Sequence, residues 1–194
     1  MRAVDADWDL VKRSREGDLR AFEQLVKRYQ GPVYSFCRRM TRSNEDAEDV
    51  AQETFVRVFR SLDRLKPRAK FSTWLYTVAR NLCLNLLRDQ ARRQTQPLEV
   101  ATGKKPHSQR GEVADENYRP DTIAARHEIS AALCEVLEEL SVAHREIIVL
   151  REFDGLDYHE IATVLGCRVG TVKSRISRAR QHLQELLKKR LEME

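Results

Sequence analysis

The feature that most constrains the fold is the stretch over residues 157–187, DYHEIATVLGCRVGTVKSRISRARQHLQELL. Asp157 can cap a first helix, and Glu160, three residues later, can bond back to the cap in a capping box. Gly166 stands where that helix must stop, because glycine adopts a left-handed turn without steric cost. The pattern predicts a helix-turn-helix, a unit that can present its second helix to a DNA major groove.

The second helix of this unit is predicted to have an apolar face and a basic face. Val172, Ile176 and Ala179 recur at helical spacing and are expected to be buried. Eight Lys or Arg residues lie between positions 168 and 190, against one acid, Glu185. A solvated basic helix of an ordinary bundle would carry more acids, so the imbalance favours DNA contact. The residues predicted to face DNA are Arg168, Thr171, Lys173, Ser174, Arg175, Ser177 and Arg178, with Arg180 beside the apolar seam and within reach of phosphates.

The composition agrees with a cytoplasmic nucleic-acid binder. The 194 residues carry a net charge of +5 with a pI near 9.1, so binding must come from local patches rather than a general cationic coat. No apolar run approaches the length of a membrane span, and the N-terminus carries Asp5, Asp7 and Asp9 rather than a signal peptide. We expect a cytoplasmic protein with no membrane insertion, no cofactor and no small-molecule substrate.

The cysteines do not predict a metal site or a disulfide framework. They are widely scattered and form no Cys-x-x-Cys pair. His127 and Cys134 could meet on a helix, but two ligands do not make a site. The sequence predicts small, mostly buried hydrophobic residues at Cys37, Cys83, Cys134 and Cys167.

The chain is predicted to consist of two domains. Residues 89–120 are poor in apolar side chains and rich in Pro, Gly and polar residues, which is typical of a flexible linker. Helical periodicity dominates the flanking blocks, residues 8–88 and 121–194, and strand alternation is absent. The predicted fold class is all-α: two small helical bundles joined by a flexible linker, the C-terminal one containing the helix-turn-helix.

In the N-terminal block, a helix over residues 44–62 is predicted to have an acidic outer face. Its buried stripe is expected to comprise Ala47, Val50, Ala51, Thr54, Phe55, Val58, Phe59 and Leu62. Val56 lies in the middle of the opposite face, among Asp49, Gln52 and Glu53. Such a residue is either a partner hot spot or a stray surface valine, and the pattern taken alone favours the stray valine.

A third helix of this block, from about Ser72, follows a loop with three cations. Cations beside aromatic side chains and exposed amides suit single-stranded nucleic acid, in which bases stack and their edges form hydrogen bonds. The alternative for Trp74 is that it simply packs on the core. The candidate residues are Lys66, Arg68, Lys70, Phe71, Trp74, Asn81, Asn85 and Arg88.

Three motifs in order, DAEDVAQETFVRVF, FSTWLYTVARNLCLNLLR and REIIVLREFDGLDYHEIATVLGCRVGTVKSRISRAR, resemble those of bacterial RNA polymerase sigma factors. The resemblance is to the small extracytoplasmic-function (ECF) class of the sigma-70 family, which keeps only domains two and four, and it covers residues 18–187. It implies a non-enzymatic factor that binds core RNA polymerase and directs initiation at specific promoters. An anti-sigma factor, which could hold the protein at the inner face of the membrane, is a further partner that the resemblance implies.

The resemblance also implies roles for individual residues. Asp49, Gln52 and Glu53 match the motif that docks on a coiled coil of the largest polymerase subunit, which favours Val56 as a hot spot. The resemblance matches residues 66–71, Asn81 and Asn85 to capture of the melted −10 element, and Lys173, Ser174, Ser177 and Arg178 to reading of the −35 element. Ile147, Ile148 and Leu150 match a helix that helps to engage the flap of the second-largest subunit.

Two alternatives belong to other classes. A stand-alone helix-turn-helix regulator would explain residues 157–187 but not the acidic face of residues 49–53. An enzyme using the carboxylates of residues 45–53 would need a phosphate loop or a convergent histidine, and the sequence offers neither.

Overall fold

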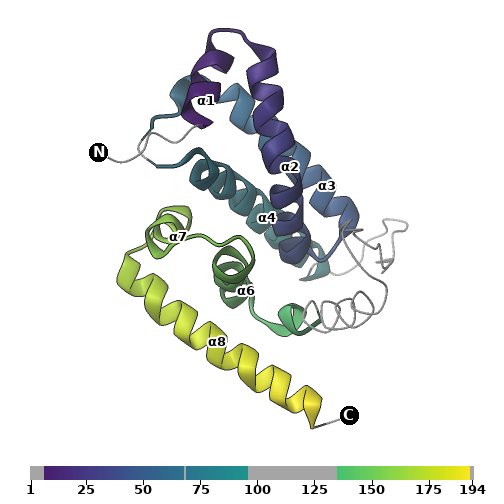
Figure 1. Ribbon diagram of the computed structural model, residues 1–194. Coiled ribbons are helices and arrows are strands. Elements are labelled where there is room, and N and C mark those ends of the chain that lie inside the picture. The colour runs from purple at the N-terminus through teal and green to yellow at the C-terminus, as the bar shows by residue number, and fades with distance from the viewer. Residues whose placement is uncertain (1–6, 68, 96–134, 193–194) are drawn as a thin grey trace, which may run out of the picture.

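The computed structural model describes residues 7–67, 69–95 and 135–192, and the regular structure of this part of the chain is entirely helical (Figure 1). The all-α prediction, with two helical regions, is therefore confirmed. The elements are α1 (Asp7–Arg15), α2 (Leu19–Thr41), α3 (Asn44–Arg60), the 3₁₀ turn η1 (Leu62–Arg64), α4 (Phe71–Thr95), α6 (Val142–Ile148), the π-helical turn η2 (Val149–Phe153), α7 (Tyr158–Leu165) and α8 (Val169–Leu191), with a further helical segment at residues 135–139. No helix among the described residues is long and apolar enough to cross a membrane.

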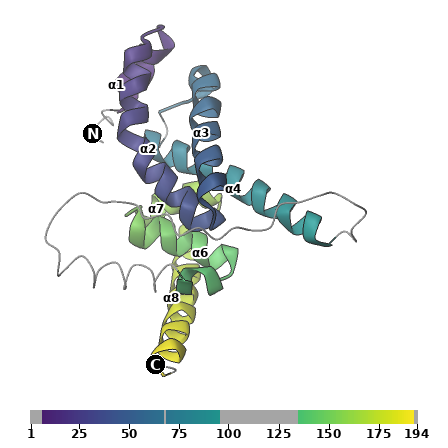
Figure 2. The ribbon, with the colours of Figure 1, turned by 90° about the vertical axis from the view of Figure 1, so that its right-hand side faces the viewer.

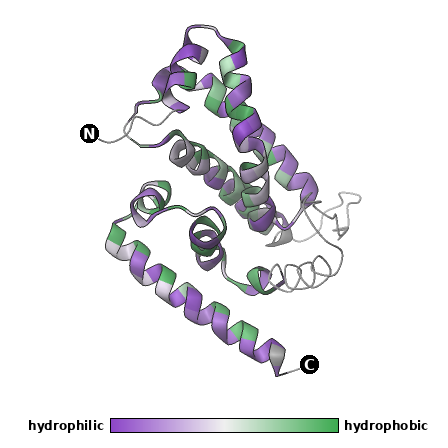
Figure 3. Ribbon diagram, viewed as in Figure 1, coloured by the Kyte–Doolittle hydropathy of each residue, from purple (hydrophilic) through white to green (hydrophobic). Residues whose placement is uncertain are grey.

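Helices α2, α3 and α4 form the N-terminal bundle. Two of them begin at side-chain caps: Asp18 accepts a hydrogen bond from the Ala21 amide at 3.2 Å, and Ser43 accepts one from the Asp46 amide at 3.2 Å. Such caps satisfy amides that have no partner within the helix. Figure 3 shows apolar residues on the sides of the helices that face one another. The fully buried side chains at the centre of this bundle include Leu25, Phe36, Met40, Phe71 and Leu75.

Helix α1, which sequence periodicity did not single out, fastens the loop before α4. The Trp8 indole donates a hydrogen bond to the Ala69 carbonyl at 3.0 Å. Arg15 donates to the Leu62 carbonyl at 2.8 Å and also bonds to the carbonyl of Leu65. The loop of predicted DNA-binding cations is therefore held by contacts from residues more than forty positions earlier in the chain.

The C-terminal half contains the predicted helix-turn-helix. The Asp157 carboxylate accepts hydrogen bonds from the amides of His159 and Glu160 at 2.8 and 2.9 Å, and Glu160 bonds back to the Asp157 amide at 2.8 Å. Gly166 ends α7 with a left-handed φ of 63°. Val172 and Ile176 of α8 are buried, as their spacing predicted. Both the capping box and the amphipathic second helix are confirmed.

The structure differs from the sequence-based expectation in the length of one helix and in the burial of one side chain. Helix α4 continues to Thr95 and so takes up residues 89–95 of the predicted linker, because its good helix formers extend the hydrogen-bonded ladder beyond the last core contact. The rest of the linker and the start of the predicted C-terminal domain, residues 96–134, lie outside the described residues. Phe59 is not in the buried stripe but 43% exposed, because it lies at the end of α3, where the Phe22 ring packs edge-on at 4.9 Å.

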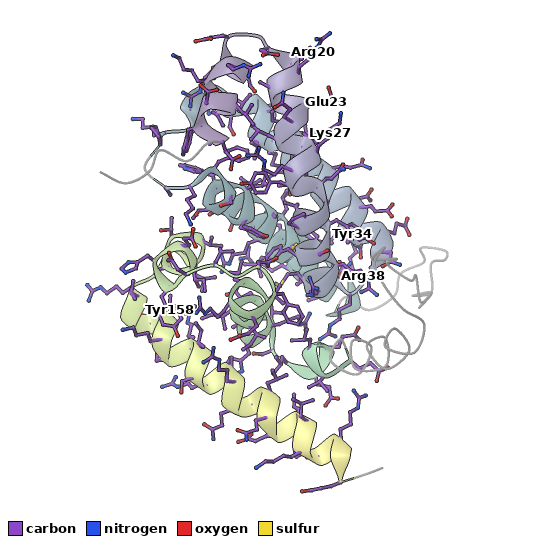
Figure 4. The ribbon with its side chains drawn as sticks, in the orientation of Figure 1. Arg20, Glu23, Lys27, Tyr34, Arg38 and Tyr158 are labelled. Atoms are coloured by element: carbon purple, nitrogen blue, oxygen red, sulfur yellow. The ribbon has the colours of Figure 1, made fainter. Side chains whose placement is uncertain are left out.

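The two halves pack directly against each other, with α6 and α7 lying along α2 and α4 (Figure 2). Arg145 of α6 is the deepest contact: its guanidinium donates to the carbonyls of Leu137 and Leu140 and, across the boundary, to that of Met40, each at 3.0 Å. The outer side of α2 remains polar, with Arg20, Glu23 and Lys27 in a row (Figure 4).

Candidate functional site

The outward side of α8 carries the residues predicted to contact duplex DNA. Arg168, Lys173, Ser174, Ser177 and Arg178 are all exposed, whereas Val172 and its neighbours on the opposite face are buried. Thr171 and Arg175 are half-buried and lie at the margin of this surface. The arrangement leaves cations and hydroxyls free to meet phosphates and base edges, while the apolar side holds the helix in place.

An open hollow on this surface adds Tyr158, a residue that the sequence did not single out. Tyr158 opens α7 close to the start of α8 (Figure 4). Together with Lys173 and Ser177 of α8, it lines the hollow. The Arg151 guanidinium lies 5.0 Å from the centre of the tyrosine ring. The sequence did contain a sign that Tyr158 lies at this surface. It directly follows the capping Asp157, and the first turn of α7 must lie close to α8 in a helix-turn-helix.

The sequence predicts that Arg180 can reach DNA phosphates, but in the structure its guanidinium is already paired. It forms an ion pair with Glu152 of η2 at 2.6 Å, and the hydrogen bond to that carboxylate raises the pKa of the guanidinium. Arg190 likewise lies 2.7 Å from Glu135. The acids that pair with these arginines of α8 come from other elements. Counting the acidic residues within α8 alone therefore misses them.

The predicted single-strand surface is formed by α4 and the loop before it. Lys66 and Lys70 are exposed, and Lys70 lies 2.8 Å from Glu160. Phe71 was misassigned: it is fully buried, packing against the rings of Trp8 and Tyr29. It therefore anchors the loop rather than offering a ring to a base. Arg68 lies outside the described residues.

Further along α4 the amide side chains are accessible. Trp74 is half-buried against the core, which agrees with the packing alternative. Asn81, Asn85 and Arg88 are exposed, and Arg88 donates to the Asn85 side-chain oxygen at 3.1 Å. The adjacent Arg80 approaches the Asn81 side-chain oxygen at 3.4 Å. These groups form a polar strip along one side of α4, with cations beside hydrogen-bonding amides.

The outer face of α3 combines acids with exposed apolar surface. Asp49 and Gln52 are exposed, and Glu53 forms an ion pair with Arg57 at 2.7 Å. Val56 is 40% exposed in the middle of this face. Because Phe59 is also exposed, the apolar surface is larger than the sequence indicated.

The helix matched to flap engagement turns its apolar residues inward. Ile147, Ile148 and Leu150 are fully buried in the core that α6 shares with its neighbours. Their periodicity reflects packing, and the expectation that their helix helps to engage the flap stays a prediction.

The cysteines and acids form no metal centre within the described ranges. No group of three or more His, Cys, Asp or Glu side chains there could hold an ion. Cys37 and Cys83 are buried, and a hydrogen bond with Cys37, together with burial, raises the pKa of the Cys83 thiol. Cys167 is half-buried, and Cys134 lies outside the described residues.

Removing the cap of α7 should loosen the helix-turn-helix. Asp157→Ala is expected to lower the free energy of unfolding by about 1 kcal/mol, whereas Asp157→Asn should retain most of the stability. The amides of Glu160 and His159 hold the pKa of Asp157 below its usual 3.8, so the contribution is complete above pH 3.8 and is lost as pH falls through the lowered pKa. Urea unfolding of the three proteins at neutral and acidic pH measures both effects. Equal stability of the wild type and the alanine variant at neutral pH would contradict the assignment.

Known sigma factors match the chain along most of its length. The family model for sigma-70 region 2 matches residues 25–93, and that for sigma-70 region 4 matches residues 130–183. The ECF RNA polymerase sigma-E factor of Escherichia coli (strain K12) is 39% identical, covering 90% of this chain and 91% of the relative. The chain belongs to the ECF class of the sigma-70 family.

Solved structures resemble both halves of this sigma factor. CnrH, in complex with the cytosolic domain of CnrY, has a TM-score of 0.70 and 31% identity, covering 95% of this chain and 99% of that one. The sigma factor RpoE of Bartonella quintana, in complex with the anti-sigma factor NepR, has a TM-score of 0.63 and 27% identity, covering 86% and 96%. The protein is thus a non-enzymatic transcription initiation factor, and the alternative of a stand-alone regulator is not favoured.

Proposed function

We propose that this sigma factor recognises promoters by binding two DNA elements with two separate surfaces. The exposed side of α8, with Lys173, Ser177 and Arg178, reads the −35 element in the major groove. The polar strip of α4, with Asn81 and Asn85, holds the melted −10 strand. The observation that carries the proposal is the presence of both surfaces, exposed on α8 and on α4, on one chain that belongs to the sigma family.

The corrected residue set follows the geometry. For the −35 element it comprises Arg168, Thr171, Lys173, Ser174, Arg175, Ser177 and Arg178, with Tyr158 added. For the −10 element it comprises Lys66, Lys70, Trp74, Asn81, Asn85 and Arg88. Arg68, outside the described residues, stays a prediction. Phe71 is buried and does not contact DNA in this proposal; it positions the loop that does. The region 2 domain accordingly extends from residue 8 to residue 95 rather than 88.

The outer face of α3 supplies the contact with core polymerase. An apolar centre at Val56, surrounded by Asp49, Gln52 and Glu53, has the composition of an interface hot spot within a polar rim. The polymerase then fixes the distance between the two DNA-binding surfaces. Two weak contacts held in this way can gain roughly 10²–10⁴ in avidity over either contact alone.

Regulation by a second protein follows from the solved relatives. NepR is named as an anti-sigma factor, and CnrY binds CnrH through a cytosolic domain. We infer that an anti-sigma factor also binds this chain, and that the chain works in the cytoplasm, where it can be held at the inner face of the membrane through such a partner.

Reconstituted transcription tests the function directly. Core polymerase with the purified protein should start at defined promoters that core polymerase alone ignores. Repression without any polymerase contact would instead indicate a stand-alone regulator. The promoters themselves can be found by sequencing the transcripts that overexpression induces.

Substitution in α8 should reduce promoter recognition by a predictable amount. A good base contact contributes about 1–3 kcal/mol of discrimination. Lys173→Ala and Arg178→Ala are therefore each expected to lower specific transcription by roughly 5- to 150-fold. Lys188→Ala is the matched control, because Lys188 is also an exposed cation of α8 but lies further along the helix, about 22 Å from Lys173 and about 15 Å from Arg178. Equal loss in all three variants would show general charge attraction rather than reading of the −35 element.

A further inference from the structure

The −10 loop, residues 65–70 between η1 and α4, is anchored in the core at both of its ends. Leu65 at its start is 4% exposed, and Phe71, directly after its end, is fully buried. Lys66 and Pro67, between these two anchors, are exposed. Since a packed core resists displacement of its side chains, the loop presents a short outward segment whose ends are fixed.

Helix α1 binds the main chain near both ends of the same loop. The Trp8 indole donates a hydrogen bond to the Ala69 carbonyl at 3.0 Å. Arg15, about two turns further along α1, donates to the Leu62 carbonyl at 2.8 Å and also bonds to the carbonyl of Leu65. Both side chains bind carbonyl oxygens, so they fix the path of the backbone whatever side chains the loop carries.

Helix α1 is itself held to the bundle by contacts that do not involve the loop. The Asp7 carboxylate, at the start of α1, accepts hydrogen bonds from Arg28 and from the Tyr29 hydroxyl of α2. Asp7 is only 3% exposed, and a carboxylate enclosed to this extent needs such partners. The Tyr29 ring lies 5.6 Å from that of Phe71, so one group of contacts joins α1, α2 and the end of the loop.

The contacts to the loop are more than a by-product of packing α1 on the core. Leu10 and Val11 supply the buried apolar side of α1, and they need no carbonyl partner. The indole N–H of Trp8 and the guanidinium of Arg15 add polar contacts that are directed at the loop alone. These two donors therefore act on the position of the loop more than on the burial of α1.

A loop with a fixed backbone can discriminate between bases better than an adaptable one. A base that leaves the stack is accepted or rejected by the shape and hydrogen-bonding groups of the pocket that receives it. A flexible loop can rearrange around several bases, which makes binding promiscuous. A loop already held in its bound shape loses little conformational entropy when the correct base enters, and it cannot adapt to the others.

We propose that Trp8 and Arg15 of α1 fix the shape of the −10 loop, and that this shape determines which base of the melted promoter strand the loop accepts. Both are positioning residues, because they contact the loop and not the DNA. This role rests on the proposed −10 function of the loop and of α4. The ligand is a nucleobase of an unpaired strand, recognised at the outward segment that contains Lys66 and Pro67.

Transcription of promoter libraries by core polymerase with the full-length protein tests this role. One library is randomised across the −10 element beside a fixed −35 element, and a second library is the reverse. Sequencing the transcripts gives the ratio of the best to the worst base at each position. Trp8→Phe keeps a ring against Phe71 but removes the N–H, and Arg15→Met removes the guanidinium. Each is expected to lower the ratio at one −10 position roughly 5-fold or more and to leave the −35 ratios unchanged.

Arg13→Met is the matched control. Arg13 is also an arginine of α1, but it pairs with Asp18 at 2.6 Å instead of binding the loop, so its variant should retain the wild-type ratios. The ratio is also insensitive to general loss of structure. A variant that only folded poorly would lower transcription from every member of a library alike, and the preference between bases would stay the same.

Lower −10 ratios in both α1 variants, with wild-type ratios in Arg13→Met, support the role of α1. Unchanged −10 ratios in either α1 variant, or an equal fall at the −35 positions or in Arg13→Met, overturn it. Asn81→Ala and Asn85→Ala test the proposed −10 function separately. If these two lower the −10 ratios and the α1 variants do not, only the role of α1 fails. If none of the four variants does so, the −10 assignment fails as well.

Discussion

Val56→Asp is expected to abolish promoter-specific transcription by preventing assembly with core polymerase. Val56 is 40% exposed at the centre of the α3 face, so the substitution should leave the fold intact. An aspartate there would have to be desolvated against the partner. Loss of a hot spot typically costs at least about 2 kcal/mol, which corresponds to roughly 30-fold weaker binding or more.

A second substitution probes the charge of the same face. Glu53→Lys reverses the sign of an acidic residue beside Val56 and releases Arg57, its ion-pair partner at 2.7 Å. Like charges across an interface disfavour binding, so core affinity should fall by a similar factor. Glu192→Lys, an identical change at an exposed position of region 4, is the control.

The measurements are core-polymerase affinity by biolayer interferometry, start-site selection in vitro and circular dichroism to verify folding. Val56→Ala should show a smaller defect than Val56→Asp, because it removes contact without adding charge. Undisturbed start-site selection in Val56→Asp and Glu53→Lys would refute the assignment of this face.

Arg145→Met is expected to destabilise the protein by about 3 kcal/mol or more. Arg145 is only 2% exposed, and its guanidinium bonds to the carbonyls of Leu137, Leu140 and Met40. Methionine fills much of the same space, but it leaves these carbonyls without their donor. Burial lowers the pKa of Arg145 to about 10, so the guanidinium still carries its charge at neutral pH and still donates these hydrogen bonds.

Urea unfolding at neutral pH measures this loss, with Arg190→Met as the control. Arg190 pairs with Glu135 at 2.7 Å but is partly exposed, and such pairs contribute about 0–1 kcal/mol. A stability loss no greater for Arg145→Met than for Arg190→Met would show that the buried carbonyls find other partners. Because Arg145 joins both halves, its loss should also weaken their contact.

Local patterns in the sequence were sufficient for much of the fold. The capping box at Asp157, the turn at Gly166 and the apolar spacing of Val172 and Ile176 involve residues close together in the chain. Their physics is short-ranged, so the helix-turn-helix could be predicted without knowledge of the remainder of the protein. The exposed face of α8 followed directly from the same periodicity.

Aromatic side chains were harder to place. The sequence favoured DNA contact for Phe71 and burial for Phe59, yet Phe71 is buried under Trp8 and Tyr29, while Phe59 at the end of α3 is exposed. Which of them is covered depends on α1 and α2, whose contacts come from distant positions. Hydrophobicity gives a tendency to be buried but does not specify the covering partner.

The sequence by itself determined the amphipathic helices α3 and α8, the cap at Asp157, the basic face of α8 and the acidic face of α3, because each depends on residues within a few turns of one another. Only the tertiary structure decided which charges are already paired. Glu152 holds Arg180, and Glu146 holds Arg80, across separations that no helical period records. Charge pairing depends on distance in space and on exclusion of water, and both are set only when the helices pack.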